Sequence, residues 1–249
     1  MTKKNKINTS IILVGGTGSR FSKIDEYPKQ LAKINKEIII IKIIKQLKKF
    51  GINYFIFPLG HKKEFFIKFF NSKENIKRFN LNIVKNFDKI KQDKININYF
   101  DAGKETSKLD RVLKSFKKIE SNNFLTTYGD GLANVNLKKL FSLYFKDKCQ
   151  KIYLTSCRKR SQYGHLKINN KNFIKTFEEK PILNDPVNIG YYIFNKLIFN
   201  KNYKSKFELE GGFLPKLIKN NTLKSYLHKG YFFSIDDKKD VLRAKKFFK

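Results

Sequence analysis

The chain has 249 residues, which suits one large domain or two small ones, and 41% of them are hydrophobic, enough for a sizeable core. No apolar run approaches the roughly 20 residues that cross a bilayer, and the apolar stretch at 11–14 is shorter than the roughly 7–15 residues of a secretory signal. Cys149 and Cys157 form neither a metal-binding spacing nor a disulfide framework. We therefore expect a soluble cytoplasmic protein with no membrane partner.

The formal net charge of +33 raises the question of a polyanionic partner. The lysines, however, are spread along the whole chain and do not gather in one arm or stripe. We expect no nucleic acid as partner, although a positive field attracts substrates that carry phosphate. The alternative, a nucleic-acid binder, predicts steeply salt-dependent binding to DNA or RNA.

Strand-like and helical hydrophobic patterns alternate along the first two thirds of the chain, which predicts an α/β fold with a mainly parallel sheet. The predicted elements are strand 10–14, helix 37–50, strand 53–59, helix 62–71, strands 81–85 and 95–100, a helix capped by Ser107, strand 124–127, helix 137–145 and strand 151–157. The last third predicts short strands at 164–168, 173–177, 190–194 and 231–235, with helices at 213–219 and from Lys238. We expect residues 1–249 to form a single domain.

A glycine-rich segment follows the first predicted strand directly, with glycines at 15, 16 and 18 and Arg20 next to them. Glycine lets the backbone approach a ligand closely, and successive N–H groups in such a loop can surround an anion. Arg20 can bind phosphate oxygens through two hydrogen bonds, and Lys29 after Pro28 could add a second cation. A tight turn without a ligand is the simpler alternative, and the Walker and dinucleotide patterns are incomplete.

Two acids follow predicted strands. Asp130 stands between two glycines, and Asp236 ends the strand at 231–235. A turn-forming aspartate or a strand terminator would explain each alone, and Asp237 could cap the last helix. Since Mg²⁺ is commonly held by one or two carboxylates plus substrate phosphates, the pair predicts a magnesium site.

The run at 13–20, followed by Pro28 and Lys29, resembles the signature of the sugar-phosphate nucleotidyltransferases. The resemblance implies a Rossmann-like, nucleotidyltransferase (GT-A-like) fold: a mixed, mainly parallel sheet flanked by helices, with a small β extension on the sugar side. It implies Asp130 and Asp236 as the Mg²⁺ ligands. The nucleotide-binding residues that it implies are Leu13, Gly15, Gly16, Thr17, Gly18, Ser19, Arg20, Lys29, Gly103, Lys108 and Gly129.

A third block, Glu179-Lys180-Pro181 with Asn188 and Gly190, matches the sugar side of the family pattern. The resemblance implies that Lys180 meets the sugar 1-phosphate and that Glu179 and Asn188 contact the sugar, with Gly190 beside them. In the implied reaction the sugar phosphate attacks the α-phosphorus of a nucleoside triphosphate in line and releases pyrophosphate. Arg20, Lys29, Asp130 and Lys180 are then the catalytic residues, and no histidine is needed.

Within the family the chain is most similar to the glucose-1-phosphate cytidylyltransferases, over nearly its whole length. The similar segments are 127–133, 101–103, 163–166 and an insert at about 72–98. Lys108 stands where those enzymes carry an arginine, and Phe232 where they carry a tryptophan. The resemblance favours CTP and glucose 1-phosphate as substrates and leaves open a homo-oligomer. The alternatives are uridylyl, thymidylyl or guanylyl transfer to another sugar 1-phosphate, and a regulatory protein that only binds nucleotide.

Overall fold

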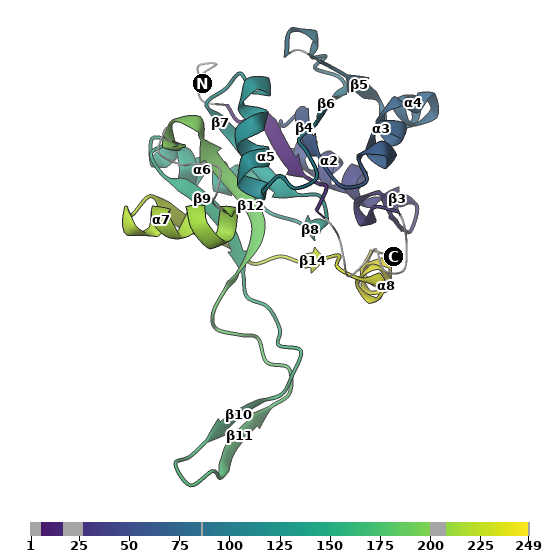
Figure 1. Ribbon diagram of the computed structural model, residues 1–249. Coiled ribbons are helices and arrows are strands. Elements are labelled where there is room, and N and C mark those ends of the chain that lie inside the picture. Colours follow the sequence, from purple (N-terminus) through teal and green to yellow (C-terminus); the bar gives the residue numbers. More distant parts are fainter. Residues whose placement is uncertain (1–5, 17–26, 86, 200–207, 249) are drawn as a thin grey trace.

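The computed structural model describes residues 6–16, 27–85, 87–199 and 208–248. Within them an eight-stranded sheet forms the centre of the molecule (Figure 1). All neighbouring strands are parallel except β12, which runs antiparallel to both of its neighbours, β7 and β9. The strands in sheet order are β13 (Leu223–His228), β9 (Ile152–Cys157), β12 (Val187–Asn195), β7 (Asn123–Tyr128), β1 (Thr9–Leu13), β4 (Tyr54–Leu59), β6 (Ile95–Asp101) and β5 (Leu81–Ile83). The predicted mixed, mainly parallel sheet is confirmed.

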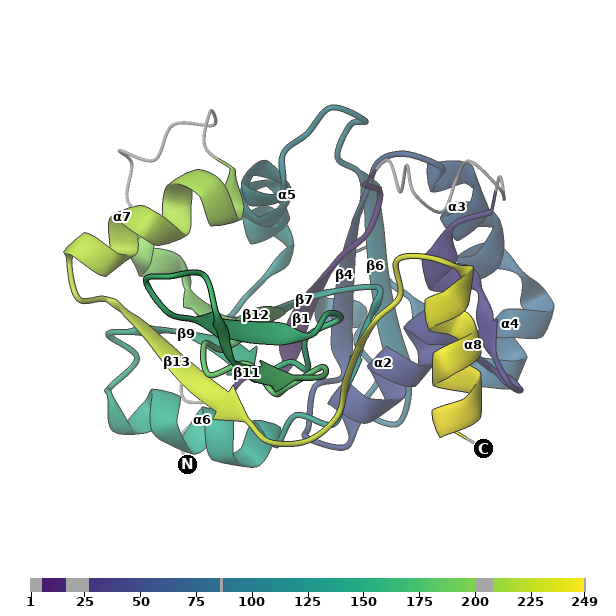
Figure 2. The ribbon, with the colours of Figure 1, turned by 90° about the horizontal axis from the view of Figure 1, so that it is seen from below.

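Helices cover both faces of this sheet (Figures 1 and 2). The alternation of side chains along β1 shows how: Ile12 packs into the core on one face, whereas Ile11 and Leu13 pack into the core on the other. The first core also receives the buried residues of α2 (Ile39–Lys48), α3 (Lys63–Asn71) and α6 (Leu137–Lys146). The second receives those of α5 (Lys108–Ser115) and α7 (Leu214–Lys219). The result is a three-layer α/β/α arrangement.

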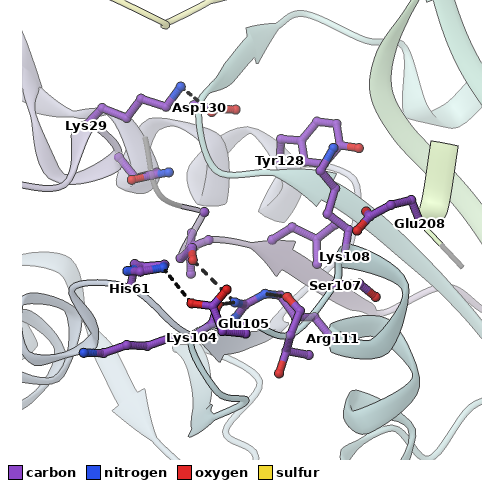
Figure 3. A pocket seen from close by; sticks show the side chains of 16 residues that line it. Lys29, His61, Lys104, Glu105, Ser107, Lys108, Arg111, Tyr128, Asp130 and Glu208 are labelled. Carbon is purple, nitrogen blue, oxygen red and sulfur yellow. Dashed lines mark hydrogen bonds and ion pairs between the residues drawn. The ribbon is translucent and has the colours of Figure 1, made fainter. Parts of the chain in front are cut away.

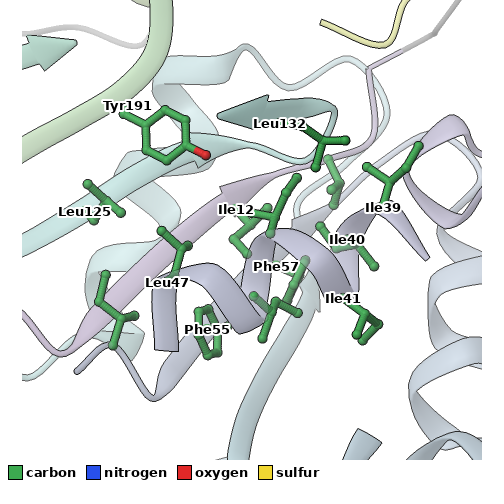
Figure 4. Packing of buried hydrophobic residues seen from close by; sticks show 14 of the residues in the cluster. Ile12, Ile39, Ile40, Ile41, Leu47, Phe55, Phe57, Leu125, Leu132 and Tyr191 are labelled. Carbon is green, nitrogen blue, oxygen red and sulfur yellow. The ribbon is translucent and has the colours of Figure 1, made fainter. Parts of the chain in front are cut away.

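Helix α2 shows how the apolar face of an amphipathic helix packs into the first core (Figure 4). Six of its ten residues are buried: Ile39, Ile40, Ile41, Ile43, Ile44 and Leu47. They pack in the same cluster as Ile12, Phe55 and Phe57 of the sheet. At about 1.5–3 kcal/mol for each large apolar side chain removed from water, this one helix contributes a substantial part of the folding free energy.

The carboxyl ends of the central strands are joined to the C-terminal part of the chain by a small second sheet. β8 (Gly131–Ala133) pairs antiparallel with β14 (Phe232–Ser234), and the N–H of Ile235 donates to the carbonyl of Asp130 at 3.0 Å. Helix α8 (Lys238–Phe247) follows and begins with a capping box formed by Asp237 and Asp240. The predicted N-cap role of Asp237 is thus confirmed, and residues about 100 apart in sequence meet at the edge of the main sheet.

A two-stranded ribbon extends away from the rest of the molecule (Figure 1). It consists of β10 (His165–Ile168) and β11 (Ile174–Glu178), and every residue of both strands is exposed. Leu166 pairs with Phe177 and Ile168 with Ile174, so one face of the ribbon is apolar. The ribbon is the small β extension that the sequence predicts.

Several boundaries differ from the prediction. The helix predicted at 37–50 begins at Ile39, because Glu37–Ile38 form a short strand (β3) with Lys33–Ile34 (β2). The prediction missed α4 (Lys73–Phe79), β8 and the edge strand β13, each of which is short or largely exposed. Over the part of the chain that the structure describes, no helix is both long and apolar enough to cross a membrane.

Candidate active site

A cavity of about 370 Å³ lies where β1, β7 and the amino-terminal end of α5 come together (Figure 3). In open α/β sheets ligands commonly bind outside the carboxyl ends of the strands. Segments that the sequence singles out for the nucleotide contribute residues to this cavity. The cavity is lined by Leu13, Val14, Gly15, Gly16, Lys29, Gln30, His61, Lys104, Glu105, Thr106, Ser107, Lys108, Arg111, Tyr128, Asp130 and Glu208.

Lys29 joins the two predicted acids. Its Nζ lies 2.8 Å from Oδ2 of Asp130 and 3.0 Å from Oδ1 of Asp236. Ser234 donates its hydroxyl to the other oxygen of Asp236 at 2.8 Å. Burial lowers the pKa of Lys29, but the two carboxylates more than offset this effect, so the pKa stands above its ordinary value. The ammonium group is therefore charged at neutral pH, and Gly16, Lys29, Asp130 and Asp236 belong to one connected site.

The glycine before Asp130 is explained by packing. A Cβ on Gly129 would lie 2.7 Å from Cγ1 of Val14 and 3.1 Å from Cγ of Gln30. The turn after β7 therefore presses against the loop after β1, and the N–H of Gly129 donates to the carbonyl of Leu13 at 3.1 Å. This close approach places Asp130 at the cavity without a side chain on Gly129 to separate the two loops.

The loop after β1 has the geometry expected of a close-approach turn. Gly15 has φ +91°, and a Cβ there would lie 2.6 Å from the amide nitrogen of Gly60 in the loop after β4. Gly16 has open space where its side chain would be. Thr17, Gly18, Ser19 and Arg20 lie outside the described residues, so their nucleotide-binding roles stay predictions.

The segment before α5 forms another wall of the cavity. Ser107 caps the helix by accepting from the N–H of Asp110 at 3.1 Å, as its sequence position predicts. Lys108 forms an ion pair with Glu210 at 3.0 Å, and its Nζ lies 5.2 Å from the ring centre of Tyr128. Gly103, with φ +98°, precedes this wall and is not one of the residues that line the cavity.

Sequence reasoning missed several residues that line this cavity: His61, Glu105, Arg111, Tyr128 and Glu208. His61 lies 3.7 Å from Glu105. No sequence signal marks these residues, because each is an ordinary helix or loop residue until the strands bring it to the cavity. Tyr128 is the exception, since it directly precedes the Gly-Asp-Gly run.

The predicted sugar-side residues occupy two places. A second cavity, of about 970 Å³, has Asp236 and Lys180 among its lining residues, together with the cations Arg158, Lys159, Arg160, Lys239 and Arg243. Lys180 also pairs with the neighbouring Glu179 at 3.0 Å. Asn188 instead lies in β12, where its side chain donates to the hydroxyl of Tyr192 and accepts from the N–H of Gly190. Asn188 and Gly190 are thus adjacent to the wall residue Tyr128, whose ring a Cβ on Gly190 would meet at 2.2 Å.

The donor set can be tested against the predicted metal. Among the described residues no group of three or more His, Cys, Asp or Glu side chains could enclose an ion. Two carboxylates that contact the same ammonium nitrogen do lie at the site. This set suits Mg²⁺, which takes hard oxygen ligands and leaves most of its positions to water and substrate phosphates.

Comparison with known proteins identifies the family of this chain. The model of the nucleotidyl transferase family matches residues 9–240. The chain belongs to this family. A probable glucose-1-phosphate cytidylyltransferase from Bacillus subtilis (strain 168) is 32% identical over 245 residues, which cover 95% of this chain and 94% of that protein. The chain is thus a member of the sugar-1-phosphate nucleotidyltransferases.

Other relatives use a different base. A D-glycero-α-D-manno-heptose 1-phosphate guanylyltransferase from Aneurinibacillus thermoaerophilus is 28% identical over 95% of this chain and 96% of that protein. The crystal structure of HddC from Yersinia pseudotuberculosis, also solved with GMP-PN, has a TM-score of 0.71 at 21% identity and covers 98% of this chain and all of that one. A UDP-glucose pyrophosphorylase in complex with UDP-glucose has a TM-score of 0.69 at 18% identity and covers 98% of both chains. These structures share the fold, and the family does not fix the base.

Proposed function

We propose that this protein transfers a cytidylyl group from CTP to glucose 1-phosphate, giving CDP-glucose and pyrophosphate, with Mg²⁺ held by Asp130 and Asp236. The observation that carries the proposal is the convergence of the glycine turn, Lys29 and both carboxylates on one site. Cytosine and glucose are supported by the Bacillus subtilis relative and by a Salmonella typhimurium glucose-1-phosphate cytidylyltransferase, 26% identical over 93% of this chain.

The nucleotide would lie in the first cavity, with its phosphates between Lys29 and the turn at Gly15 and Gly16, and Arg20 is proposed from its sequence position as a further phosphate ligand. The metal would neutralise charge between the phosphates when bound. Lys29 stays charged at neutral pH, so it can donate hydrogen bonds to the departing pyrophosphate without giving up its proton. Because the nucleophile is already an anion, this site needs no general base.

The acceptor would lie in the second cavity, where Lys180 and the neighbouring cations can bind its phosphate and hold it facing the α-phosphorus. Glu179 and Asn188 are the proposed contacts to the sugar hydroxyls. Since Asp236 lines this cavity and contacts Lys29 of the first, the two substrates would meet at the carboxylate pair.

A second candidate is guanylyl transfer to a heptose 1-phosphate. It is supported by the Aneurinibacillus thermoaerophilus relative, which matches nearly the whole chain. In this chain Lys108 stands where the cytidylyltransferases carry arginine. A lysine cannot make the bidentate hydrogen bonds of an arginine, so this position does not favour CTP over GTP.

The test is pyrophosphate release from each of CTP, UTP, TTP and GTP, combined in turn with glucose 1-phosphate, mannose 1-phosphate and D-glycero-α-D-manno-heptose 1-phosphate in the presence of Mg²⁺. The proposal expects the highest kcat/KM with CTP and glucose 1-phosphate. A highest value with GTP and the heptose phosphate would establish the second candidate. No release with any pair would overturn both.

A further inference from the structure

A single buried arginine holds together the loops that form the first cavity. Arg111 belongs to α5, is only 4% exposed and lies at the cavity wall (Figure 3). Its hydrogen bonds to described residues all go to main-chain carbonyl oxygens: Pro58 at 3.1 Å, Gly15 at 3.4 Å, Gly103 at 3.0 Å, Lys104 at 3.2 Å and Thr106 at 3.1 Å. These carbonyls belong to β4 itself, which contains Pro58, and to the two segments that follow β1 and β6.

This arrangement uses the special shape of arginine. The guanidinium presents five N–H donors in one rigid plane, so it can reach carbonyls on several sides at once. A lysine offers one compact ammonium group and cannot span the same set. Burying a charge is costly, and burial lowers the pKa of Arg111, while the charge of Asp101 acts in the opposite direction. Packing alone would not require a buried cation, so the hydrogen bonds from Arg111 to the main-chain carbonyls indicate a further role.

The carbonyls that Arg111 binds determine where the neighbouring N–H groups point. In a trans peptide the C=O and the following N–H point to opposite sides. The residues that follow four of the five carbonyls line the cavity: Gly16, Lys104, Glu105 and Ser107. Among the described residues, none accepts a hydrogen bond from the N–H groups of these four. Arg111 therefore orients four N–H groups that belong to residues lining the cavity and have no acceptor among the described residues, and groups of this kind can bind phosphate and the polar edge of a base.

We propose that Arg111 is a positioning residue for the nucleoside triphosphate: it fixes the turn at Gly15 and the segment 103–107 relative to each other, so that their N–H groups bind the nucleotide without first rearranging. The role rests on the proposed function. It concerns the first cavity alone, since the acceptor cavity, with Lys180 and Asp236, is lined by other residues. Loss of Arg111 should therefore weaken the binding of the triphosphate and leave the binding of the sugar phosphate unchanged.

The test compares Arg111→Lys with the wild-type protein by isothermal titration of CTP with Mg²⁺, and by KM for each substrate. We expect the dissociation constant and the KM for CTP to rise about tenfold or more, because loops that are no longer held must be ordered on binding. The KM for glucose 1-phosphate should stay within about twofold.

Gly60→Ala is a second variant, in case Arg111→Lys fails to fold. A Cβ on Gly60 would lie 2.3 Å from Nη2 of Arg111, so this change displaces the guanidinium while keeping the arginine. It should reproduce the selective loss of CTP affinity in weaker form.

Two controls lose stability away from the cavity. Tyr144→Phe removes a buried hydrogen bond to Asn123, and Gly51→Ala strains a turn with φ +87° beyond the end of α2. Both should lower the melting temperature and keep both KM values.

The outcomes distinguish a positioning role of Arg111 from a purely structural one. A selective loss of CTP affinity in Arg111→Lys or Gly60→Ala, absent from both controls, supports the role. If the two site variants lose stability but bind CTP like the wild type, Arg111 is structural only and the inference is overturned. If the wild-type protein binds CTP, UTP, TTP and GTP no better than a control nucleoside, the proposed function fails as well.

Discussion

The first cavity and the segment that follows the β10–β11 ribbon hold their predicted site residues in different ways. At the cavity, Lys29 is 12% exposed and is held by two carboxylates, and Arg111 is held by five carbonyls. On the ribbon side, Lys180 is 55% exposed and pairs with Glu179, a sequence neighbour that is 59% exposed. Lys29 and Arg111 are thus held by the core of the fold, whereas Lys180 and Glu179 lie in an exposed segment outside it.

This difference in burial suggests a division of roles between residues that act in the phosphate transfer and residues that determine which acceptor is bound. A phosphate site gains from rigid donors and low solvent access, because charge–charge interactions strengthen as water is excluded. A segment outside the core can change its side chains without disturbing packing, as loops that carry specificity commonly do. Substitutions at the cavity should therefore alter kcat or the KM for CTP, and substitution of Lys180, which follows the ribbon, should alter the KM for the acceptor.

The largest effect is expected at Asp130. Asp130→Ala removes a proposed metal ligand, and kcat should fall by about 10³-fold or more in the pyrophosphate-release assay. Asp147→Asn is the matched control, because that acid forms a surface ion pair with Lys224 at 2.7 Å and should keep its rate. Near wild-type turnover in Asp130→Ala would show that the metal assignment is wrong.

The next largest effect is expected at Lys29. Lys29→Met should lower kcat by about 10²–10³-fold, because it removes a preorganised donor to the leaving group. The rate of the wild type should show no titration of Lys29 between pH 6 and 9, since its pKa lies above the ordinary 10.5. An unchanged kcat in the variant would remove Lys29 from the mechanism.

The same lysine makes a prediction about stability. A pKa raised in the folded state stabilises the fold fully below the unfolded value of 10.5, and this contribution is lost as the pH rises through the folded pKa. The difference in free energy of unfolding between wild type and Lys29→Met should be constant from pH 7 to 9 and shrink above about pH 10.5. Urea unfolding of both proteins at each pH measures it, and a difference that grows above pH 10.5 would contradict the assigned ion pairs.

A smaller effect is expected at Lys180. Lys180→Gln should raise the KM for glucose 1-phosphate about tenfold and leave the KM for CTP nearly unchanged. The melting temperature should not move, because the side chain is largely exposed and its ion pair with Glu179 is of the weak surface kind. Lys175→Gln, on the exposed strand β11, is the matched control. A loss of CTP affinity in Lys180→Gln would break the division between the two sides.

The smallest effect on activity is expected far from both cavities. Tyr144→Phe leaves the side-chain oxygen of Asn123 without its 2.6 Å hydrogen bond and should cost about 1–3 kcal/mol of stability, with both KM values unchanged. Thermal unfolding and steady-state kinetics check both parts. A change in either KM would show that the sheet transmits distant strain to the site.

Local patterns carried much of the prediction. Two strands and one helix were recognisable from the sequence: β1 and β4 by their apolar runs, and α2 by its helical periodicity before Gly51. A buried strand or an amphipathic helix needs such a pattern wherever it packs. The glycines at 15 and 129 are recognisable for the same reason, since only glycine tolerates the positive φ or the close contact found there. The edge strand β13 was missed because its exposed residues lack an apolar run.

By itself the sequence determined the fold class, the nucleotidyltransferase signature and the identity of the acids and the lysines, because these depend on residue type and short spacing. Only the tertiary structure decided that Lys29 lies between Asp130 and Asp236, that Arg111 joins β4 to the loops after β1 and β6, and that Lys180 shares a cavity with Asp236. Those contacts join residues up to 207 positions apart, and strand order and the β8–β14 pairing bring them together. No local pattern records such a meeting, because it arises from burying both faces of one sheet at once.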